Sequence, residues 1–350
     1  MAPGIPPAYM GFVGFVRFIG GELDGQIVRV TSADLSLKQE ITRPDVIDSR
    51  YDRSVYQLGP RVIEGTLAFP ALYGFPDGGG NMLLETYKLA AYRDATSGVL
   101  LKSTFDVKYA QNDNPNHSEF RYTDNVMNTW QMSVAAEESV NRTLGVIGTD
   151  RIQRAHLVET GLLSDDMDPP TLAQMPVTRV VTWNDAVFQI YRNPAHTNHT
   201  TGRLSVPPAP NALIDRDYIR SFEVNINNNV QRFYTLNGLL VPQDIAPTKR
   251  DVNGNAVLMG RHESLGDLAF TNDQFCNEVT EIRFGYDSSI PETEETCQGK
   301  FIVRLPNVVF EIEEIALTND LFESTVAWHS LVNAASGTLG NLDPLISGIE

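Results

Sequence analysis

The chain is poor in cysteine and in basic residues. Its 350 residues include two cysteines, Cys276 and Cys297, which excludes a disulfide-dense scaffold and a four-cysteine zinc site. We expect two free thiols in a reducing compartment. Lysine and arginine number 27 against 44 aspartates and glutamates, for a formal charge of −17. A surface that grips nucleic acid needs basic residues to contact phosphates. The acidity is therefore compatible with simple solubility or with a surface that repels phosphate.

Long hydrophobic runs are missing as well. The apolar segment at residues 12–19 is short and interrupted by Arg17, and there is no cleavage-site pattern ahead of the domain. A transmembrane helix needs about 20 apolar residues, and a secretory signal ends in a cleavage site. We therefore predict that this chain does not insert into a membrane.

Familiar catalytic and cofactor motifs are also missing. The sequence has no Gly-x-Ser-x-Gly elbow, no His-Glu-x-x-His, no phosphate-binding Gly-Lys-Ser/Thr loop and no dinucleotide fingerprint. His196 and His199 have the spacing of metal ligands but no third ligand nearby. Residues 251–255 begin like a calcium loop, but Ala256 replaces the required glycine and His262 the bidentate glutamate. We predict no enzyme activity, no cofactor and no metal site.

Alternating polar and apolar residues dominate what the sequence does contain. The alternation runs through residues 32–41, where Leu35, Leu37 and Ile41 share one side, and again through residues 63–69. A period of two is typical of half-buried strands. The segment between them, residues 42–60, has interleaved charges and few apolar residues, so we interpret it as an arm that is buried only by a partner. The candidate contact residues of this arm are Arg43, Asp45, Asp48, Arg50, Asp52 and Arg53.

A weaker copy of this stretch begins at Ser221. Residues 30–37 align with 219–226, and residues 65–69 align with 266–270 with four identities in five. Tyr109 aligns with Tyr286, and residues 125–126 align with 307–308. The offsets drift between 177 and 201 while the order of elements is kept. This self-similarity predicts a tandem duplication.

The pattern elsewhere is rich in strands and poor in helix. We predict one helix at residues 81–94, a shorter counterpart at 272–279, and a second hairpin arm with a tight turn at Asn253-Gly254. Strands are expected at residues 100–109, 120–122, 127–134, 143–147, 177–183, 186–191, 218–226, 281–286, 300–305, 308–317 and 324–332.

These elements predict a mainly β fold with two tandem β-sandwich or β-barrel domains, each with one flanking helix and a long hairpin or loop arm. A polar, proline-stiffened passage at residues 165–170 is typical of a domain boundary. We therefore expect a first β domain at residues 1–150, a linker at 151–175 and a second β domain at 176–350.

Several segments resemble the tail tube proteins of long-tailed bacteriophages. The resemblance lies in pattern and element order across most of the chain, without an invariant motif to anchor it. It is carried by SADLSL at 32–37, ITRPDVI at 41–47, GPRVIEG at 59–65, LPNVVFEI at 305–312, LTNDL at 317–321 and VAW at 326–328. It implies a β-barrel or sandwich whose copies close into rings of six folds, and rings that stack into a hollow tube.

The resemblance further implies a structural protein of the virion tail, assembled in the host cytoplasm. Its main partner would be itself, as a trimeric ring of duplicated folds. The alternative is a hexameric ring of chains with one tube fold and one outer domain. Other tail proteins (tape measure, terminator, baseplate or sheath) would also bind it, and DNA would pass transiently without sticking.

The strand face that lines such a channel should lack lysine and arginine. Residues 127–136 contain no charged residue, and residues 308–317 contain glutamates but no base. Glu311 and Glu313 are the lumen candidates.

Two other classes of function stay open. A carbohydrate- or receptor-binding adhesin would expose aromatic residues in a groove, whereas Trp130, Trp183 and Trp328 lie in strand patterns that indicate core. An enzyme on a jelly-roll scaffold would need a carboxylate pair or a metal triad. Neither pattern is found in the sequence.

Overall fold

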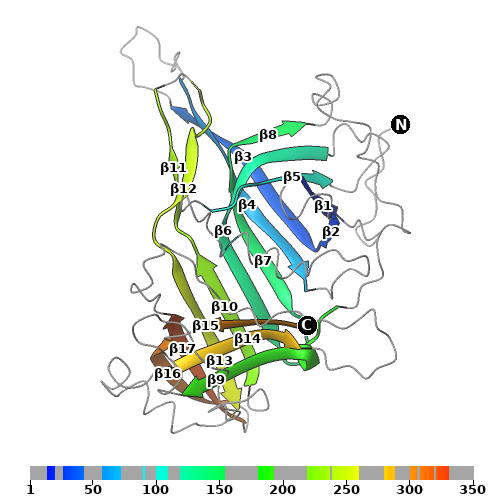
Figure 1. The fold of residues 1–350 in the computed structure, drawn as a ribbon, viewed down its shortest axis with the longest axis vertical. Coiled ribbons are helices and arrows are strands. Elements are labelled where there is room, and N and C mark those ends of the chain that lie inside the picture. The colour runs from blue at the N-terminus through cyan, green and yellow to red at the C-terminus, as the bar shows by residue number, and fades with distance from the viewer. Residues whose placement is uncertain are drawn as a thin grey trace, which may run out of the picture.

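Antiparallel strands account for most of the chain that the computed structural model describes (Figure 1). The predicted mainly β fold is confirmed. The described residues are 14–19, 27–42, 57–71, 90, 100–108, 119–153, 180–192, 219–236, 239–259, 280–287, 300–305, 308–318 and 321–330.

Eight strands form one continuous antiparallel sheet. Four come from the first half of the chain and four from the second half, and β6 and β10 join them in the middle. Within the described residues β3 pairs only with β4 and β16 only with β17, so these two strands form the edges. The order is β3 (Ser32–Thr42), β4 (Gln57–Pro70), β7 (Asn141–Gly148), β6 (Glu119–Ala135), β10 (Ile219–Asn227), β13 (Asp251–Met259), β17 (Leu321–Ser330) and β16 (Val308–Thr318).

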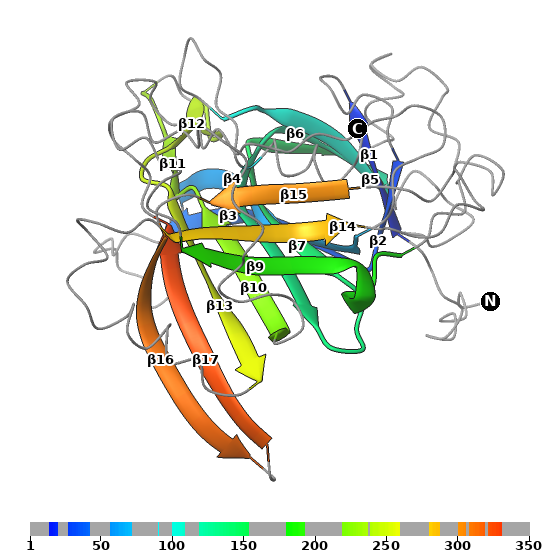
Figure 2. The same ribbon diagram turned by 60° about the horizontal axis from the view of Figure 1, so that its bottom comes forward.

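Shorter strands form a second layer and a separate hairpin. The N-terminal part of β6 leaves the large sheet and pairs with β5 and β8. Figure 2 shows β9, β14 and β15 lying across the large sheet. The members are β1 (Gly14–Ile19), β2 (Ile27–Val30), β5 (Ser103–Lys108), β8 (Asp150–Gln153), β9 (Ala186–Arg192), β14 (Thr280–Asp287) and β15 (Lys300–Leu305), and the hairpin is β11 (Val230–Phe233) with β12 (Asp244–Pro247).

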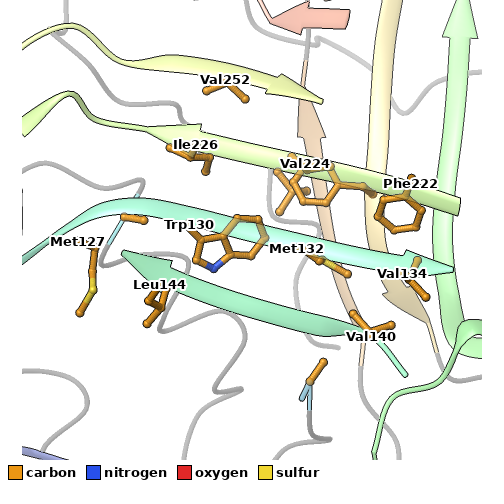
Figure 3. Packing of buried hydrophobic residues seen from close by; sticks show 14 of the residues in the cluster. Met127, Trp130, Met132, Val134, Val140, Leu144, Phe222, Val224, Ile226 and Val252 are labelled. Atoms are coloured by element: carbon orange, nitrogen blue, oxygen red, sulfur yellow. The ribbon is translucent and has the colours of Figure 1, made fainter. Parts of the chain in front are cut away.

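The core lies between the large sheet and these shorter strands. Phe222, Val224 and Ile226 are buried while their neighbours in β10 are polar and half-buried, as the alternation requires. Figure 3 shows these side chains beside those of β6. The rings of Trp130 and Phe284 lie 6.2 Å apart between centroids, which joins the two layers.

The two halves of the large sheet have the same strand order. It is β3-β4-β7-β6 in the first half and β10-β13-β17-β16 in the second. The registers agree too, because Leu35 pairs with Gly65 and Val224 pairs with Gly254, each 189 residues later. Strand for strand, β10 therefore stands where β3 stands, and β13 where β4 stands.

A β-bulge also recurs at the same place. The β6–β7 ladder shifts between Met127 and Thr129, and the β16–β17 ladder shifts between Phe310 and Ile312. Bulges insert one extra residue and reset the alternation beyond it. β16 therefore corresponds to β6 by a shift of 183, counted from Met127 to Phe310.

Several local predictions were wrong. Asn253-Gly254 lies in the middle of β13, not in a turn, and the hairpin arm of the second half is β11–β12. Trp183 is 45% exposed in a short 3-10 helix (Trp183–Asp185), although Trp130 and Trp328 are buried. Ile41 is exposed near the end of β3, beyond the point where the pairing with β4 shifts by one residue. The alignment matched residues 65–69 of β4 with residues 266–270. The strand that pairs with β10 as β4 pairs with β3 is instead β13.

Other predictions fall on residues that the structure does not describe. These include residues 266–270, the helix at 272–279 and all of the helix at 81–94 except Ala90, which is helical. Residues 154–179 hold most of the predicted linker, so the domain limits stay a prediction. Cys276 and Cys297 also lie outside the described residues.

Candidate assembly and channel surfaces

The predicted arm leaves the large sheet at the far end of β3. Thr42 pairs with Gln57, so the two ends of the arm lie side by side. The six charged arm residues, Arg43, Asp45, Asp48, Arg50, Asp52 and Arg53, lie outside the described part of the chain. Their role in contacts between rings stays a prediction.

The face of the large sheet opposite the core carries short polar side chains. They occupy alternate positions along the middle strands and are half-buried or exposed. Successive residues of a strand point to opposite faces. Because the residues between these positions are buried in the core, the polar side chains lie on the other face of the sheet. They include Thr129, Gln131, Ser133, Glu223, Asn225, Asn227, Asn253 and Asn255. We call this surface the polar face.

The two lumen candidates lie on β16, at one edge of this sheet. Glu311 is the extra residue of the bulge, and its side chain is 53% exposed. Its Oε2 atom lies 3.1 Å from Nε2 of His329 on β17. His329 alternates with the buried Trp328, which puts this pair on the polar face. Glu313 pairs with the buried Val326 across the ladder. Paired residues share a face of the sheet, so Glu313 occupies a core-side position of β16 and not the polar face.

Basic residues at the polar face are paired with carboxylates. Nζ of Lys38 lies 3.1 Å from Oε2 of Glu64, and Nζ of Lys249 lies 3.0 Å from Oδ1 of Asp251. The hydrogen bond from Lys249 is the main cause that lowers the pKa of Asp251. Paired cations are less able to hold phosphate than free ones, so this surface is neutral to acidic.

Two more ion pairs tie neighbouring elements together. Arg232 of β11 donates a hydrogen bond to Glu64 of β4, and Arg220 donates one to Glu323 of β17. The bond from Arg232 is the main cause that lowers the pKa of Glu64, and Lys38 adds to it. The first pair holds the β11–β12 hairpin against the first half of the sheet.

A family model for phage tail tube proteins matches residues 75–259, which is 185 of the 350 residues. The chain belongs to this family. The match starts ahead of β5 and ends with the last residue of β13, so it covers the β6–β10 junction between the two halves of the sheet. A comparison with curated proteins returned no match.

A tail tube protein is a structural component of the virion tail, so self-association and contacts with other tail proteins belong to its role. In the described part of this tail tube protein, no helix is long and apolar enough to cross a membrane. The same residues include no cluster of three or more His, Cys, Asp or Glu side chains placed for a metal ion. His196 and His199 lie outside them.

The sequence did not reveal two features of the site. One is the unbroken pairing of β6 with β10, which joins strands far apart in the chain. The other is the exposed apolar tip of the β11–β12 hairpin, at Phe233, Tyr234 and Leu236. A run of aromatic and aliphatic residues between polar neighbours was the available signal for the tip.

Proposed function

We propose that three copies of this tail tube protein close into a ring whose inner wall is the large sheet, and that stacked rings form a channel for DNA. One observation carries the proposal. The β6–β10 junction joins two four-stranded units of the same strand order head to tail. The free edge strands, β3 and β16, are the counterparts of the two strands at that junction, β10 and β6.

The edges are complementary in this sense. β16 has the place in the second unit that β6 has in the first, and β3 has the place that β10 has in the second. The contact seen within the chain can therefore be repeated between β16 of one copy and β3 of the next. A head-to-tail contact of this kind generates a ring when the rotation closes. Closure would also remove edges that otherwise invite uncontrolled pairing.

The chain count follows from the units. Each chain supplies eight strands to the sheet in two units, so three chains would supply six units and 24 strands. A tandem duplication explains the two units, and the shared strand order, glycine position and bulge support it. The hexameric alternative keeps one unit per chain on the inner wall. It is less well supported, because both units lie in one continuous sheet.

The polar face is the surface that we assign to the lumen. Glu311 would lie there with Glu223, and Lys38 and Lys249 would be neutralised by their carboxylate partners. Basic side chains on a channel wall bind phosphates and release counterions. A wall of carboxylates and small polar groups would let DNA pass without sticking.

A tube with two open ends offers binding surfaces to other tail proteins. Tape measure, terminator, baseplate or sheath proteins would bind the lumen, the ends or the outer wall, and assembly would take place in the host cytoplasm. No step in this role calls for enzyme activity or a cofactor.

Electron microscopy of the purified full-length chain tests the proposal. We expect rings or tubes with a central channel. Monomers or compact particles without a channel, at concentrations where tail proteins assemble, would contradict it.

A further inference from the structure

Exposed large apolar side chains gather at the two opposite ends of the large sheet. One end is where β3 stops, β4 starts and the β11–β12 hairpin projects, and we call it the arm end. The other is where β6 and β13 stop and β10 starts, and we call it the turn end (Figure 1). Of the ten exposed large apolar residues in the described part, six lie at the arm end (Ile41, Leu58, Phe233, Tyr234, Leu236, Leu239) and three at the turn end (Val180, Trp183, Met259).

The hairpin tip at the arm end is held in place from behind. Ile245 of β12 is buried with Val126 and Ile147 of the large sheet. The backbone N–H of Arg61 donates a hydrogen bond of 2.6 Å to the carbonyl oxygen of Leu240. Arg232 is paired with Glu64 on β4. The apolar tip is therefore presented outward by a supported hairpin.

The turn end carries a cavity of about 450 Å³. Phe188, Ile219 and Phe222 are among the residues that line it. The exposed Trp183 and Met259 also line it. This volume falls in the range of ordinary ligand pockets. An exposed apolar surface of this kind marks an interaction site.

We propose that the hairpin tip of one copy binds in this cavity on a copy in the next ring of the tube, with Leu236 as the main anchor. The proposal rests on the proposed function. The tip and the cavity lie at opposite ends of β10 and β13, which are nine residues long, or about 30 Å at the rise of a strand. They cannot meet within one chain. A shift along the strands brings the arm end of one copy onto the turn end of another.

The geometry of this contact accounts for open-ended growth. The two surfaces differ and point in opposite directions, so each bound copy offers a fresh surface for the next. A heterologous contact that does not close on itself generates a filament. The edges of the sheet would close each ring, and the ends of the sheet would stack the rings.

Three single substitutions in the full-length chain test this inference. Leu236→Asp alters the tip, Met259→Asp alters the cavity, and Asn255→Asp adds a similar charge on the polar face of β13 as a matched control. We expect tubes from the wild type and from Asn255→Asp, and single rings from the other two. Electron microscopy and sedimentation separate these products. Leu239→Asp is a second tip variant with the same expected result.

A mixture of the two defective variants gives the sharpest result. The Met259→Asp ring keeps a sound tip and the Leu236→Asp ring keeps a sound cavity. One ring of each kind should therefore bind to the other. Pairs of rings should form, and stacks of more than two rings should not.

Other outcomes separate this inference from the proposed function. Normal tubes from either variant, or a mixture that stays as single rings, would overturn the stacking contact while rings persist. Normal elongation would also result if the cavity takes a segment of another tail protein. Loss of rings in both variants would assign the two surfaces to ring closure instead. A wild type that forms no ring at all would contradict the proposed function itself.

Discussion

Gly254 lies under the indole of Trp328, its partner across the β13–β17 ladder. A Cβ added at Gly254 would lie 2.4 Å from a ring carbon of Trp328 and 2.2 Å from the carbonyl oxygen of Glu223. A Cβ added at its counterpart Gly65 would be even closer to a backbone carbonyl oxygen, 1.8 Å from that of Asp34. Both positions therefore need glycine so that the sheet can pack.

Gly254→Ala should lower the free energy of unfolding by about 1–3 kcal/mol, the usual cost of overpacking a core. Gly145→Ala is the matched control. Its Cβ would meet the hydroxyl oxygen of Thr129 at 2.1 Å, and a side chain can rotate away where a backbone carbonyl cannot. Urea unfolding of both variants measures the difference. Equal losses would contradict the close approach of Trp328 and Gly254.

Acid should weaken the attachment of the β11–β12 hairpin. The pKa of Glu64 is lowered, first by the hydrogen bond from Arg232, so the folded chain holds this proton less tightly than the unfolded chain does. The stabilisation is present at neutral pH and is lost as pH falls below about 4.5 through the lowered pKa. Because the pair is partly exposed, Glu64→Gln should cost only about 0.2–1 kcal/mol at pH 7.

The same variant should match the wild type once the wild-type carboxyl is protonated. Thermal unfolding at pH 7 and at about pH 2 makes the comparison. A difference that does not change with pH would show that Glu64 acts through packing and not through its charge.

Much of the architecture could be predicted from local pattern. Leu35, Ile63 and Leu67 are buried where the alternation placed them, because a half-buried strand has to put every second side chain in the core. Glycine was misread at Asn253-Gly254, since the same residue serves a turn and a close backbone approach. The crowding at Gly254 comes from Trp328, far along the chain, and no local pattern shows it.

Pairing between distant strands was also beyond the sequence. Trp130 pairs with Ile226 across the β6–β10 junction, but alternation fixes only the face of each strand, not its neighbour. The bulges at Asn128 and Glu311 shift the phase in the middle of strands that look regular. Glu311 was chosen for its charge and strand pattern, and its contact with His329 became visible only with the fold.

The register of ring closure can be tested by cross-linking. Ser133 pairs with Glu223 at the internal junction, and their counterparts at the free edges are Ala316 and Asp34. Directly opposed residues of antiparallel strands have Cβ atoms about 4.5–5.5 Å apart, close to the distance that a disulfide needs. Ala316→Cys combined with Asp34→Cys should give covalent dimers and closed trimers on oxidation, seen by non-reducing gel electrophoresis.

The cross-link needs a background without other thiols, so Cys276 and Cys297 are replaced by serine. Ala316→Cys combined with Lys38→Cys is the control, since Lys38 lies four residues further along β3. Cross-linking in the control alone, or in neither pair when rings have formed, would contradict the proposed register.

Removal of the arm should separate ring formation from stacking. Deletion of residues 43–53 leaves the paired ends Thr42 and Gln57 within reach of each other, so we expect folded chains that form rings and fail to stack. A variant of full length with its six charged arm residues replaced by serine tests the charges alone. If the deleted chain forms normal tubes under the electron microscope, the arm is not an assembly element.

Charge reversal at the lumen should slow DNA without harming assembly. Glu311→Lys would add a phosphate contact to the channel wall, and such a contact weakens as salt rises. We expect normal tubes and slower DNA ejection at low salt, with recovery at high salt. The neutral variant Glu311→Gln should have a smaller effect. Ejection at the normal rate at low salt would place Glu311 outside the channel.

Cryo-electron microscopy of tubes from the full-length chain counts the chains in each ring. We predict three chains of 38.8 kDa, about 116 kDa per ring, with β16 of each chain paired to β3 of the next and the polar face of the sheet on the lumen. Six chains per ring, or a ring in which β3 and β16 of neighbouring chains lie apart, would contradict this arrangement.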